Sequence, residues 1–293
     1  MIYLIGLNPA LDCYETLPTI ELGKKNVVDR QTFVCGGKAV NLALMLKKLK
    51  TPSKLLLAAG GFTGDFLVRE LKTNEIDFRL FWQKTPTRIN FKLKTTEETS
   101  FDLKSKVEKE TLKEMRHYLE ENVTQNDIVV ASGVAEEEDY RFLLTHLIGK
   151  TVLDVDGKLL RSLLDLKPWL IKPNEEELSA CFEPEEPSLD YFLSQGVETV
   201  LATFGSSGSL LKRSDQTFML PALTTTVLTT VGCGDCYLAA FLSYFLKGYS
   251  YQEAFFLGAI AASLKASCGD FPEEQQIETC KTLSYSNLRV KTL

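Results

Sequence analysis

The chain has 293 residues, of which 44% are hydrophobic and 25% charged, a balance typical of a globular protein with a substantial core. Its net charge of −6 argues against general binding to nucleic acid or anionic membranes, which needs a basic face. The start, MIYLIGLNPALD, lacks the basic residues of a secretory signal, and the longest apolar stretches are shorter than the ~20 residues that cross a bilayer. We therefore expect a cytoplasmic enzyme or binding protein.

Short β-rich runs alternate with helical patterns through most of the chain, first as IYLIGL, AVNLALMLKKL, KLLLAAG and TGDFLVRELK. The same rhythm resumes with DIVVASG, YRFLLTHLIG, TVLDV, WLIKPN, EELSACF and TVLATFG. This alternation predicts one α/β domain over residues 1–293, with a mainly parallel sheet flanked by helices. Active sites in such sheets lie beyond the carboxyl ends of the strands, where the glycine-rich and acidic motifs of this chain fall.

The segment TRINFKLK, residues 87–94, breaks the rhythm. Its apolar residues alternate one by one with polar residues, which predicts a half-exposed strand. SFDLKSK is a candidate hairpin partner, and VVDRQTFV, residues 27–34, is a candidate for the same sheet. We therefore expect a small second sheet that forms a lid, with strands drawn from about residues 11–34 and 87–104.

Three motifs at the ends of predicted strands offer ligand contacts. In FVCGGKAVN, Gly37 lets a ligand approach the backbone and Asn41 suits sugar hydroxyls, although an ordinary tight turn is the alternative. In IKPNEEEL, Asn174 and Glu177 project to one side and suit a hydrated Mg²⁺, although a capped helix with an acidic first turn is the alternative. TFGSSG is typical of a nucleotide-contacting turn or of a simple strand-to-strand turn.

The stretch TTVGCGDCYLAAF contains a Cys-x-x-Cys pair. A zinc site needs about four Cys or His ligands, but no second pair exists and the two histidines, His117 and His146, lie in helix-like stretches. A redox pair needs a lowered thiol pKa, which Asp235 between the two sulfurs disfavours. We interpret Cys233 and Cys236 as small apolar fillers.

The same stretch is a glycine turn that enters a helix, formed by Gly232, Cys233, Gly234 and Asp235. The N–H groups of a first helical turn, aided by the helix dipole, bind anions. A carboxylate beside such a site is explained if Asp235 is a general base, which takes a proton from a hydroxyl while the N–H groups hold the phosphoryl group under attack. The alternative is an Asp that caps the helix.

As a set and in this order, these motifs resemble the PfkB (ribokinase-like) carbohydrate kinases, most closely the sugar-phosphate branch with 1-phosphofructokinases and tagatose-6-phosphate kinases. The resemblance runs nearly end to end, through LNPALD, GGKAVNLA, GGFTGDF, TRINFK, KPNEEEL, TFGSSG and TTVGCGD. It implies a ribokinase-like three-layer sandwich with a small β-sheet lid. It also implies ATP- and Mg²⁺-dependent phosphorylation of a ketohexose monophosphate, either tagatose 6-phosphate or fructose 1-phosphate, to the bisphosphate. A monovalent cation is a further candidate cofactor, and the lid is a candidate homodimer surface.

The resemblance also implies a role for each matching residue. Asp235 would be the catalytic base, and the amides of Gly232, Cys233 and Gly234 would form the anion hole. Asp12, Gly37 and Asn41 would hold the sugar hydroxyls. Arg88 would clamp the phosphate of the sugar, assisted by Lys25 (or its neighbour Lys24) and Lys38, because a guanidinium fork suits a phosphate dianion. ATP contacts are implied at Lys172, Asn174, Thr203, Gly205 and Gly208, and Mg²⁺ would be organised by Glu177, through water, and by Asn174.

The chain departs from the family pattern at Cys233, Cys236 and Ala39, in the lid hairpin, and in SGVAEEED, where the branch typically has Ser-Gly-Ser-Leu-Pro. These departures leave the exact substrate open. One alternative is a kinase of fructose 6-phosphate. A second is a kinase of an unphosphorylated sugar, and such an enzyme would not need the Arg88 clamp. A third is a non-catalytic sensor of a sugar phosphate or nucleotide, which would not need Asp235. A Rossmann dehydrogenase fits poorly, because LIGLNPALD lacks G-x-G-x-x-G.

Overall fold

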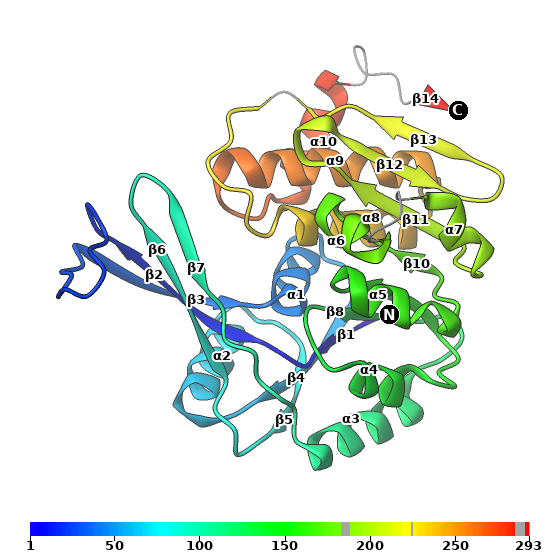
Figure 1. Cartoon of the computed structure of the whole chain (residues 1–293). Coiled ribbons are helices and arrows are strands. Elements are labelled where there is room, and N and C mark those ends of the chain that lie inside the picture. Colours follow the sequence, from blue (N-terminus) through cyan, green and yellow to red (C-terminus); the bar gives the residue numbers. More distant parts are fainter. Residues whose placement is uncertain (183–187, 224, 285–290, 293) are drawn as a thin grey trace.

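The computed structural model describes residues 1–182, 188–223, 225–284 and 291–292 (Figure 1). Within these residues, ten strands form one large sheet in the order β14-β13-β12-β11-β10-β9-β8-β1-β4-β5. Seven adjacent strands run parallel: β11 (Thr199–Thr203), β10 (Leu170–Ile171), β9 (Lys150–Asp154), β8 (Ile128–Ser132), β1 (Ile2–Gly6), β4 (Ser53–Ala59) and β5 (Phe78–Trp82). The remaining three are antiparallel: β12 (Ser209–Lys212), β13 (Thr217–Leu220) and β14 (Lys291–Thr292). The mainly parallel sheet is as predicted.

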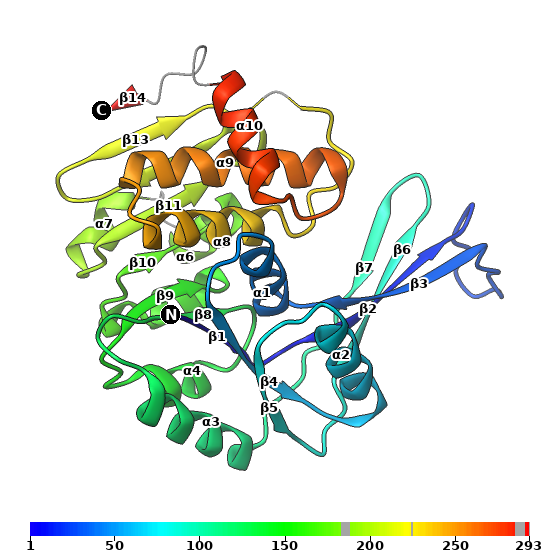
Figure 2. The same ribbon diagram turned by 180° about the vertical axis from the view of Figure 1, so that it is seen from behind.

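Helices cover both faces of this sheet and complete the three layers. Figure 1 shows one layer in front: α3 (Lys109–Asn122), α4 (Glu137–Leu144), α5 (Gly157–Ser162), α6 (Glu175–Phe182) and α7 (Leu189–Ser194). Figure 2 shows the other: α1 (Lys38–Lys48), α2 (Gly61–Thr73), α8 (Cys233–Leu246), α9 (Tyr251–Cys268) and α10 (Glu274–Ser284). None of the helices in the described part of the chain has the length and apolar character to span a membrane.

The strand β1 shows why the sequence folds into three layers. Ile2 and Leu4 belong to the core beneath α1, α8 and α9, whereas Tyr3 and Ile5 belong to the core on the opposite face. A strand that is buried on both faces reads as a continuous apolar run, which is typical of parallel sheets.

One helix is shorter than predicted. The helix α4 ends at Leu144, and His146 lies in a turn with a φ of 65°, because the chain must reverse there to enter β9.

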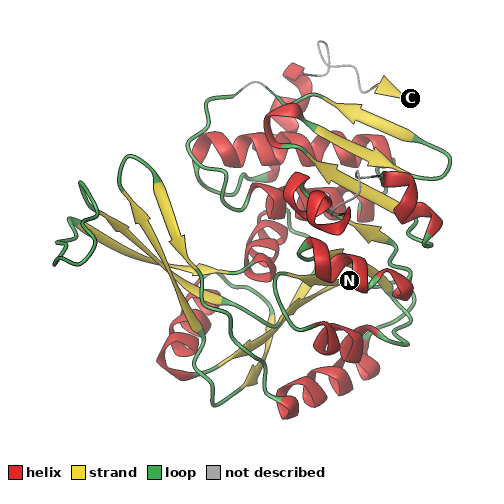
Figure 3. Cartoon of the chain, viewed as in Figure 1, coloured by secondary structure: helices red, strands yellow, loops and turns green. Residues whose placement is uncertain are grey.

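A second sheet projects from the side of the body (Figure 3). In the described residues it has four strands in the order β3-β2-β6-β7, and we call it the lid. These strands are β2 (Ala10–Thr16), β3 (Arg30–Gly36), β6 (Arg88–Lys94) and β7 (Glu98–Phe101). Residues 87–94 therefore contain a strand, as predicted. The hairpin partner begins at Glu98, slightly earlier than SFDLKSK, because the tight turn at residues 95–97 pairs Phe91 with Phe101.

The two faces of the lid differ in chemistry. The register places Asp12 beside Asn90 on one face, and Cys13 between Phe33 and Phe91 on the other. The apolar residues are the more exposed ones: Phe91 is 42% exposed, whereas Asn90 is 5% exposed. The period-two pattern thus places polar side chains toward the body and leaves an apolar outer face, which at Phe33 contacts Phe66 of α2.

Candidate active site

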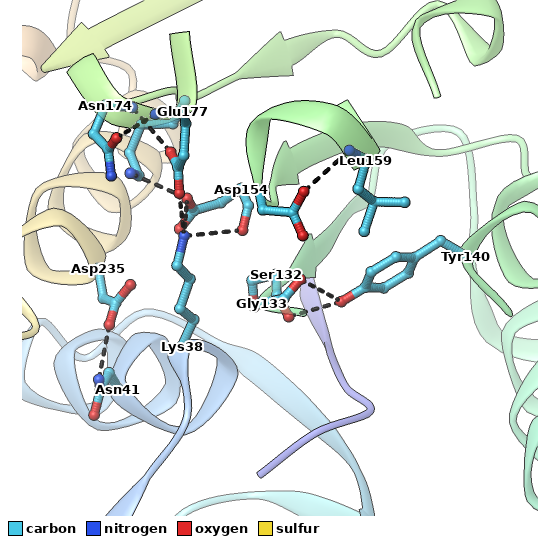
Figure 4. A network of polar contacts seen from close by, with 12 residues as sticks. Lys38, Asn41, Ser132, Gly133, Tyr140, Asp154, Leu159, Asn174, Glu177 and Asp235 are labelled. Atoms are coloured by element: carbon cyan, nitrogen blue, oxygen red, sulfur yellow. Dashed lines mark hydrogen bonds and ion pairs between the residues drawn. The ribbon is translucent and has the colours of Figure 1, made fainter. Parts of the chain in front are cut away.

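The start of α8 carries the acidic residue of the glycine turn. Gly232 precedes the helix with a φ of 75°, a left-handed conformation that favours glycine. Asp235 lies in the first turn and is 6% exposed, and its Oδ2 accepts a 2.7 Å hydrogen bond from Asn41 Nδ2 of α1 (Figure 4). Its carboxylate does not cap the helix, contrary to the structural alternative. The Cys233 N–H donates to the Thr230 carbonyl at 3.3 Å, whereas the N–H groups of Gly234 and Asp235 have no backbone acceptor in the described part of the chain. A carboxylate and available first-turn donors therefore meet here.

The surroundings of Asp235 change its acidity. Burial and the negative charge of Asp154 raise the pKa of Asp235 to about 6, against the opposing effects of Lys38, the Asn41 hydrogen bond and Lys172. A pKa close to neutrality lets a carboxylate accept a proton efficiently and still be ionised at cellular pH.

Four charged side chains form a cluster beside this carboxylate (Figure 4). Lys38 Nζ lies 2.9 Å from Asp154 Oδ1 and 3.0 Å from Glu177 Oε1, and Lys172 Nζ lies 3.1 Å from the same Asp154 oxygen. Burial alone would lower the pKa of Lys38, but the charges of Asp154 and Glu177 outweigh burial and raise it. Burial alone would raise the pKa of Asp154, but the two ammonium groups outweigh it and lower that pKa.

The start of α6 adjoins the cluster. Glu177 N donates to Asn174 Oδ1 at 2.8 Å, and Asn174 N donates to Glu177 Oε2 at 2.9 Å, so the two residues cap the helix reciprocally. Thr203 lies beside Asn174, because the two residues form a bridge at the ends of β10 and β11. Gly205 and Gly208 flank the turn that follows. The structure therefore brings Lys172, Asn174, Glu177, Thr203, Gly205 and Gly208 to neighbouring strand ends.

The base of the lid contributes a second polar group. Asn90 Nδ2 donates to Asp12 Oδ1 at 2.8 Å, and burial raises the pKa of Asp12. A Cβ atom on Gly36 would lie within 2.1 Å of an Asp12 carboxylate oxygen, so a side chain there would displace that carboxylate from Asn90. Since Gly36 ends β3 and Gly37 leads into α1, Asp12 lies next to the helix that carries Lys38 and Asn41.

Arg88 lies at the same base of the lid. Its guanidinium donates to the carbonyl oxygens of Leu103 (2.9 Å) and Asn8 (3.3 Å), and its buried Nε has no partner among the described residues. Ser105 donates to Asn8 Oδ1 at 2.6 Å, and Asn8 donates to the carbonyl of Val134 at 3.2 Å. The altered segment SGVAEEED therefore adjoins Arg88 through Asn8.

Two residues expected in the phosphate clamp lie elsewhere. Lys25 is exposed on the connection between β2 and β3, as is Lys24, which pairs with Glu21. This connection follows Thr16, at the end of the lid opposite the Asp12–Asn90 pair (Figure 1). The structure does not bring Lys25 together with Asp12 and Arg88, because the long β2–β3 ribbon carries it away from the body. The ammonium group of Lys38 lies in the charge cluster beside α6.

This arrangement of strand ends, glycine turn and lid is matched by known proteins. A sequence model of the pfkB family carbohydrate kinases matches residues 3–271. The chain belongs to this family. It is 28% identical to the 1-phosphofructokinase of Bacillus subtilis, over 95% of this chain and 96% of that protein. It is 25% identical to the D-tagatose-1-phosphate kinase of Klebsiella oxytoca, over 92% and 94%. Ribokinase from Thermotoga maritima has the same fold, with a TM-score of 0.80 at 18% identity over 95% of this chain and 98% of that one.

In this pfkB kinase, sequence reasoning missed Asp154 and Asn90. Asp154 lies in the predicted run TVLDV and is the last residue of β9, and a carboxylate at the carboxyl end of a parallel strand is the signal that could have found it. Asn90 lies on the polar side of the predicted lid strand, directly opposite Asp12. The pairing of distant strands, which the sequence does not display, gives both residues their neighbours.

The cysteines of the turn differ in their surroundings. Cys236 is fully buried, with its Sγ 3.6 Å from Met45 Sδ, which is the packing role predicted for it. Cys233 is half-buried and its thiol donates to the carbonyl of Thr229 at 3.5 Å. Burial raises the pKa of both thiols, so neither resembles an activated redox cysteine.

Proposed function

We propose that this pfkB kinase transfers the γ-phosphoryl group of ATP to the free primary hydroxyl of a ketohexose 1-phosphate. The supporting observation is the buried Asp235, held by Asn41 at the start of α8 and bordered by Lys38 and Lys172. The carboxylate accepts the hydroxyl proton while the hydroxyl oxygen bonds to phosphorus and the bond from phosphorus to ADP breaks. The first-turn amides of α8 stabilise the charge on the transferring group.

The choice of a 1-phosphate comes from the relatives and from the shape of the substrate. One relative is named 1-phosphofructokinase and another D-tagatose-1-phosphate kinase. Both names favour a sugar 1-phosphate, so of the two expected substrates they favour fructose 1-phosphate over tagatose 6-phosphate. A ketohexose 1-phosphate carries its phosphate at one end and a free primary hydroxyl at the other. Asp12 and Asn90 suit the ring hydroxyls, and the guanidinium of Arg88, at the same base of the lid, suits the phosphate.

The charges of the cluster fit a requirement for Mg²⁺. Two cations, Lys38 and Lys172, stand against the three carboxylates of Asp154, Glu177 and Asp235, which leaves one net negative charge beside the expected triphosphate. Among the described residues, no group of three His, Cys, Asp or Glu side chains could hold a metal directly. This donor set suits an ion that keeps its waters, organised by Glu177 and Asn174. When bound, Mg²⁺ neutralises charge on the phosphates.

The test is an ADP-release assay over a substrate panel. We expect the highest kcat/KM for fructose 1-phosphate or tagatose 1-phosphate, and no turnover when EDTA replaces Mg²⁺. The panel includes tagatose 6-phosphate, fructose 6-phosphate and fructose, each assayed with K⁺ or Na⁺ as the monovalent cation. A preference for unphosphorylated fructose would contradict the proposal, and nucleotide binding without any turnover would favour a sensor.

We also infer that two copies associate through the outer face of the lid. Phe33, Phe91 and Phe101 lie in one row across the strands and are 44%, 42% and 56% exposed. A continuous apolar row on a projecting sheet is unusual for a monomer. A second copy of the same face is complementary to it about a twofold axis, because both copies then bury the same row.

A further inference from the structure

Asp154 is the point where the charge cluster converges. It is the last residue of β9 and is completely buried. Its Oδ1 contacts both Lys38 Nζ, at 2.9 Å, and Lys172 Nζ, at 3.1 Å. These lysines come from different elements, the start of α1 and the residue after β10. One carboxylate oxygen therefore joins two elements that are distant in the sequence.

The Asp154 carboxylate accepts no backbone hydrogen bond among the described residues. Its Oδ2 is buried and has no hydrogen-bond partner among the described residues. Asp156, two residues later, offers the contrast: its carboxylate accepts from Leu159 N at 3.1 Å and caps α5. A buried carboxylate that binds no backbone group costs folding free energy unless its charge is paired. The pairing partners of Asp154 are the two lysines.

Both ammonium groups border the proposed anion site. A Cβ atom on Gly234 would lie 3.4 Å from Lys172 Nζ, so this lysine lies against the glycine turn. Lys38 and Asn41 are three residues apart and share one face of α1, and Asn41 holds Asp235. Without a carboxylate between them, two like charges at this separation would repel each other and turn away from the turn.

Building on the proposed function, we propose that Asp154 is a positioning residue that holds the ammonium groups of Lys38 and Lys172 against the transferring phosphoryl group. It touches neither substrate and acts through the two lysines. The lysines are then in place before the nucleotide binds, so no free energy is needed to orient them during the reaction. Preorganised charges of this kind stabilise a transition state more than they stabilise the bound ground state.

The test is a double-mutant cycle with Asp154→Asn and Lys38→Met, assayed at saturating Mg²⁺. We expect Asp154→Asn to lower kcat by about 10- to 100-fold, as loss of an orienting partner typically does. The KM for the sugar phosphate should stay unchanged. If Asp154 acts through Lys38, the double variant should have the kcat of the worse single variant within about twofold. The matched control is Asp127→Asn, which removes another buried carboxylate, paired at 2.8 Å with the amino terminus at the opposite edge of the sheet.

Several outcomes would overturn this role. The first two are an unchanged kcat in folded Asp154→Asn and an equal loss of kcat in Asp127→Asn. The third is a pair of fully additive effects on kcat in the cycle. The fourth is complete recovery of kcat in Asp154→Asn at raised Mg²⁺, which would make Asp154 a metal-organising residue. If Asp154→Asn does not fold, a cycle of Lys38→Met with Lys172→Met takes its place, and additive losses there would equally reject the proposal.

The substrate panel tests the proposed function independently of Asp154. If the wild-type protein phosphorylates no sugar in the panel, the proposed function is wrong. The Asp154 proposal is then tested by calorimetry with AMP-PNP. A loss of affinity in Asp154→Asn that is shared with Lys38→Met, and absent from Asp127→Asn, supports it, and an unchanged affinity rejects it.

Discussion

Asn41 on α1 and Asp235 on α8 are 194 residues apart in the chain and joined by a 2.7 Å hydrogen bond. The amide occupies Oδ2 of the carboxylate and fixes its orientation, which leaves Oδ1 for a substrate hydroxyl. Asn41→Ala should therefore lower kcat while leaving the sugar-phosphate KM within a few fold. The measurement is steady-state kinetics, and a change confined to that KM would show that Asn41 acts on the sugar instead.

Asp235→Asn should retain the fold and ATP binding but lower kcat by at least ~10²-fold, the scale of a lost general base. The same variant should be more stable. Because the folded pKa of about 6 lies above the usual value of 3.8, the ionised group destabilises the fold above pH 6. Removing that charge should raise the free energy of unfolding at pH 8 by on the order of 3 kcal/mol. Near-normal turnover would refute the role of Asp235 as the base.

The pH dependence of kcat/KM should show an acid limb with an apparent pKa near 6, because Asp235 must be ionised in the free enzyme. Asp154 raises this pKa, whereas Lys38 and Lys172 lower it. Asp154→Asn should therefore move the limb to lower pH, and Asp127→Asn should leave it in place. The stabilising contribution of protonated Asp235 to the free energy of unfolding is fully present below pH 4 and is lost as the pH rises through 6. A limb that stays unchanged in Asp235→Asn would assign it to another group.

Arg88→Ala should lower kcat/KM for the sugar phosphate at least ~10-fold, since a charge-assisted contact to phosphate contributes roughly 1.5–3 kcal/mol. The KM for ATP should hardly change. Lys94→Ala is the matched control, because Lys94 is exposed on the same strand and ends it at the far side of the lid. Both KM values are measured, and an unchanged sugar-phosphate KM would reopen the alternative of a neutral sugar.

Cys233→Ala and Cys236→Ser should leave activity intact or improve it, because the sulfurs take no part in the transfer. Cys236→Ser should nevertheless lower stability by about 1–2 kcal/mol, since it buries a hydroxyl against Met45. Thermal unfolding and turnover are measured together. Bound zinc, or a redox-dependent change in activity that either substitution abolishes, would contradict this interpretation.

Phe91→Asp should convert the proposed homodimer to a monomer, because it places a charge in the middle of the apolar row of the lid. Phe142→Asp is the control: Phe142 is 45% exposed, much like Phe91, but lies on α4. Size-exclusion chromatography with light scattering gives the mass of each variant. A monomeric wild-type protein, or an unchanged dimer in Phe91→Asp, would reject the lid as the interface.

Local sequence signals predicted the elements of the fold but not all of the neighbours in the site. The alternation around Phe91 and the glycine turn before Asp235 are encoded within a few residues, and both were read correctly as structure. Asp154 and Asp156 are chemically alike and close in sequence, yet one holds two lysines and the other caps a helix. The cap at Asp156 is a local feature of the start of α5, whereas Asp154 gains its lysines from elements that only the fold brings together. Lys25 was expected in the phosphate clamp because motif order gives no information on the length of the β2–β3 ribbon.

The short connection between β3 and α1 has a consequence for how the two substrates influence each other. Gly37 is the one residue between the strand next to Asp12 and the helix that carries Lys38 and Asn41. A displacement of the lid at β3 should therefore reach the helix that carries Lys38 and Asn41. On the proposed function, we expect sugar binding and nucleotide binding to be linked through this helix, and the factor by which one ligand changes the affinity of the other is then the same in both directions.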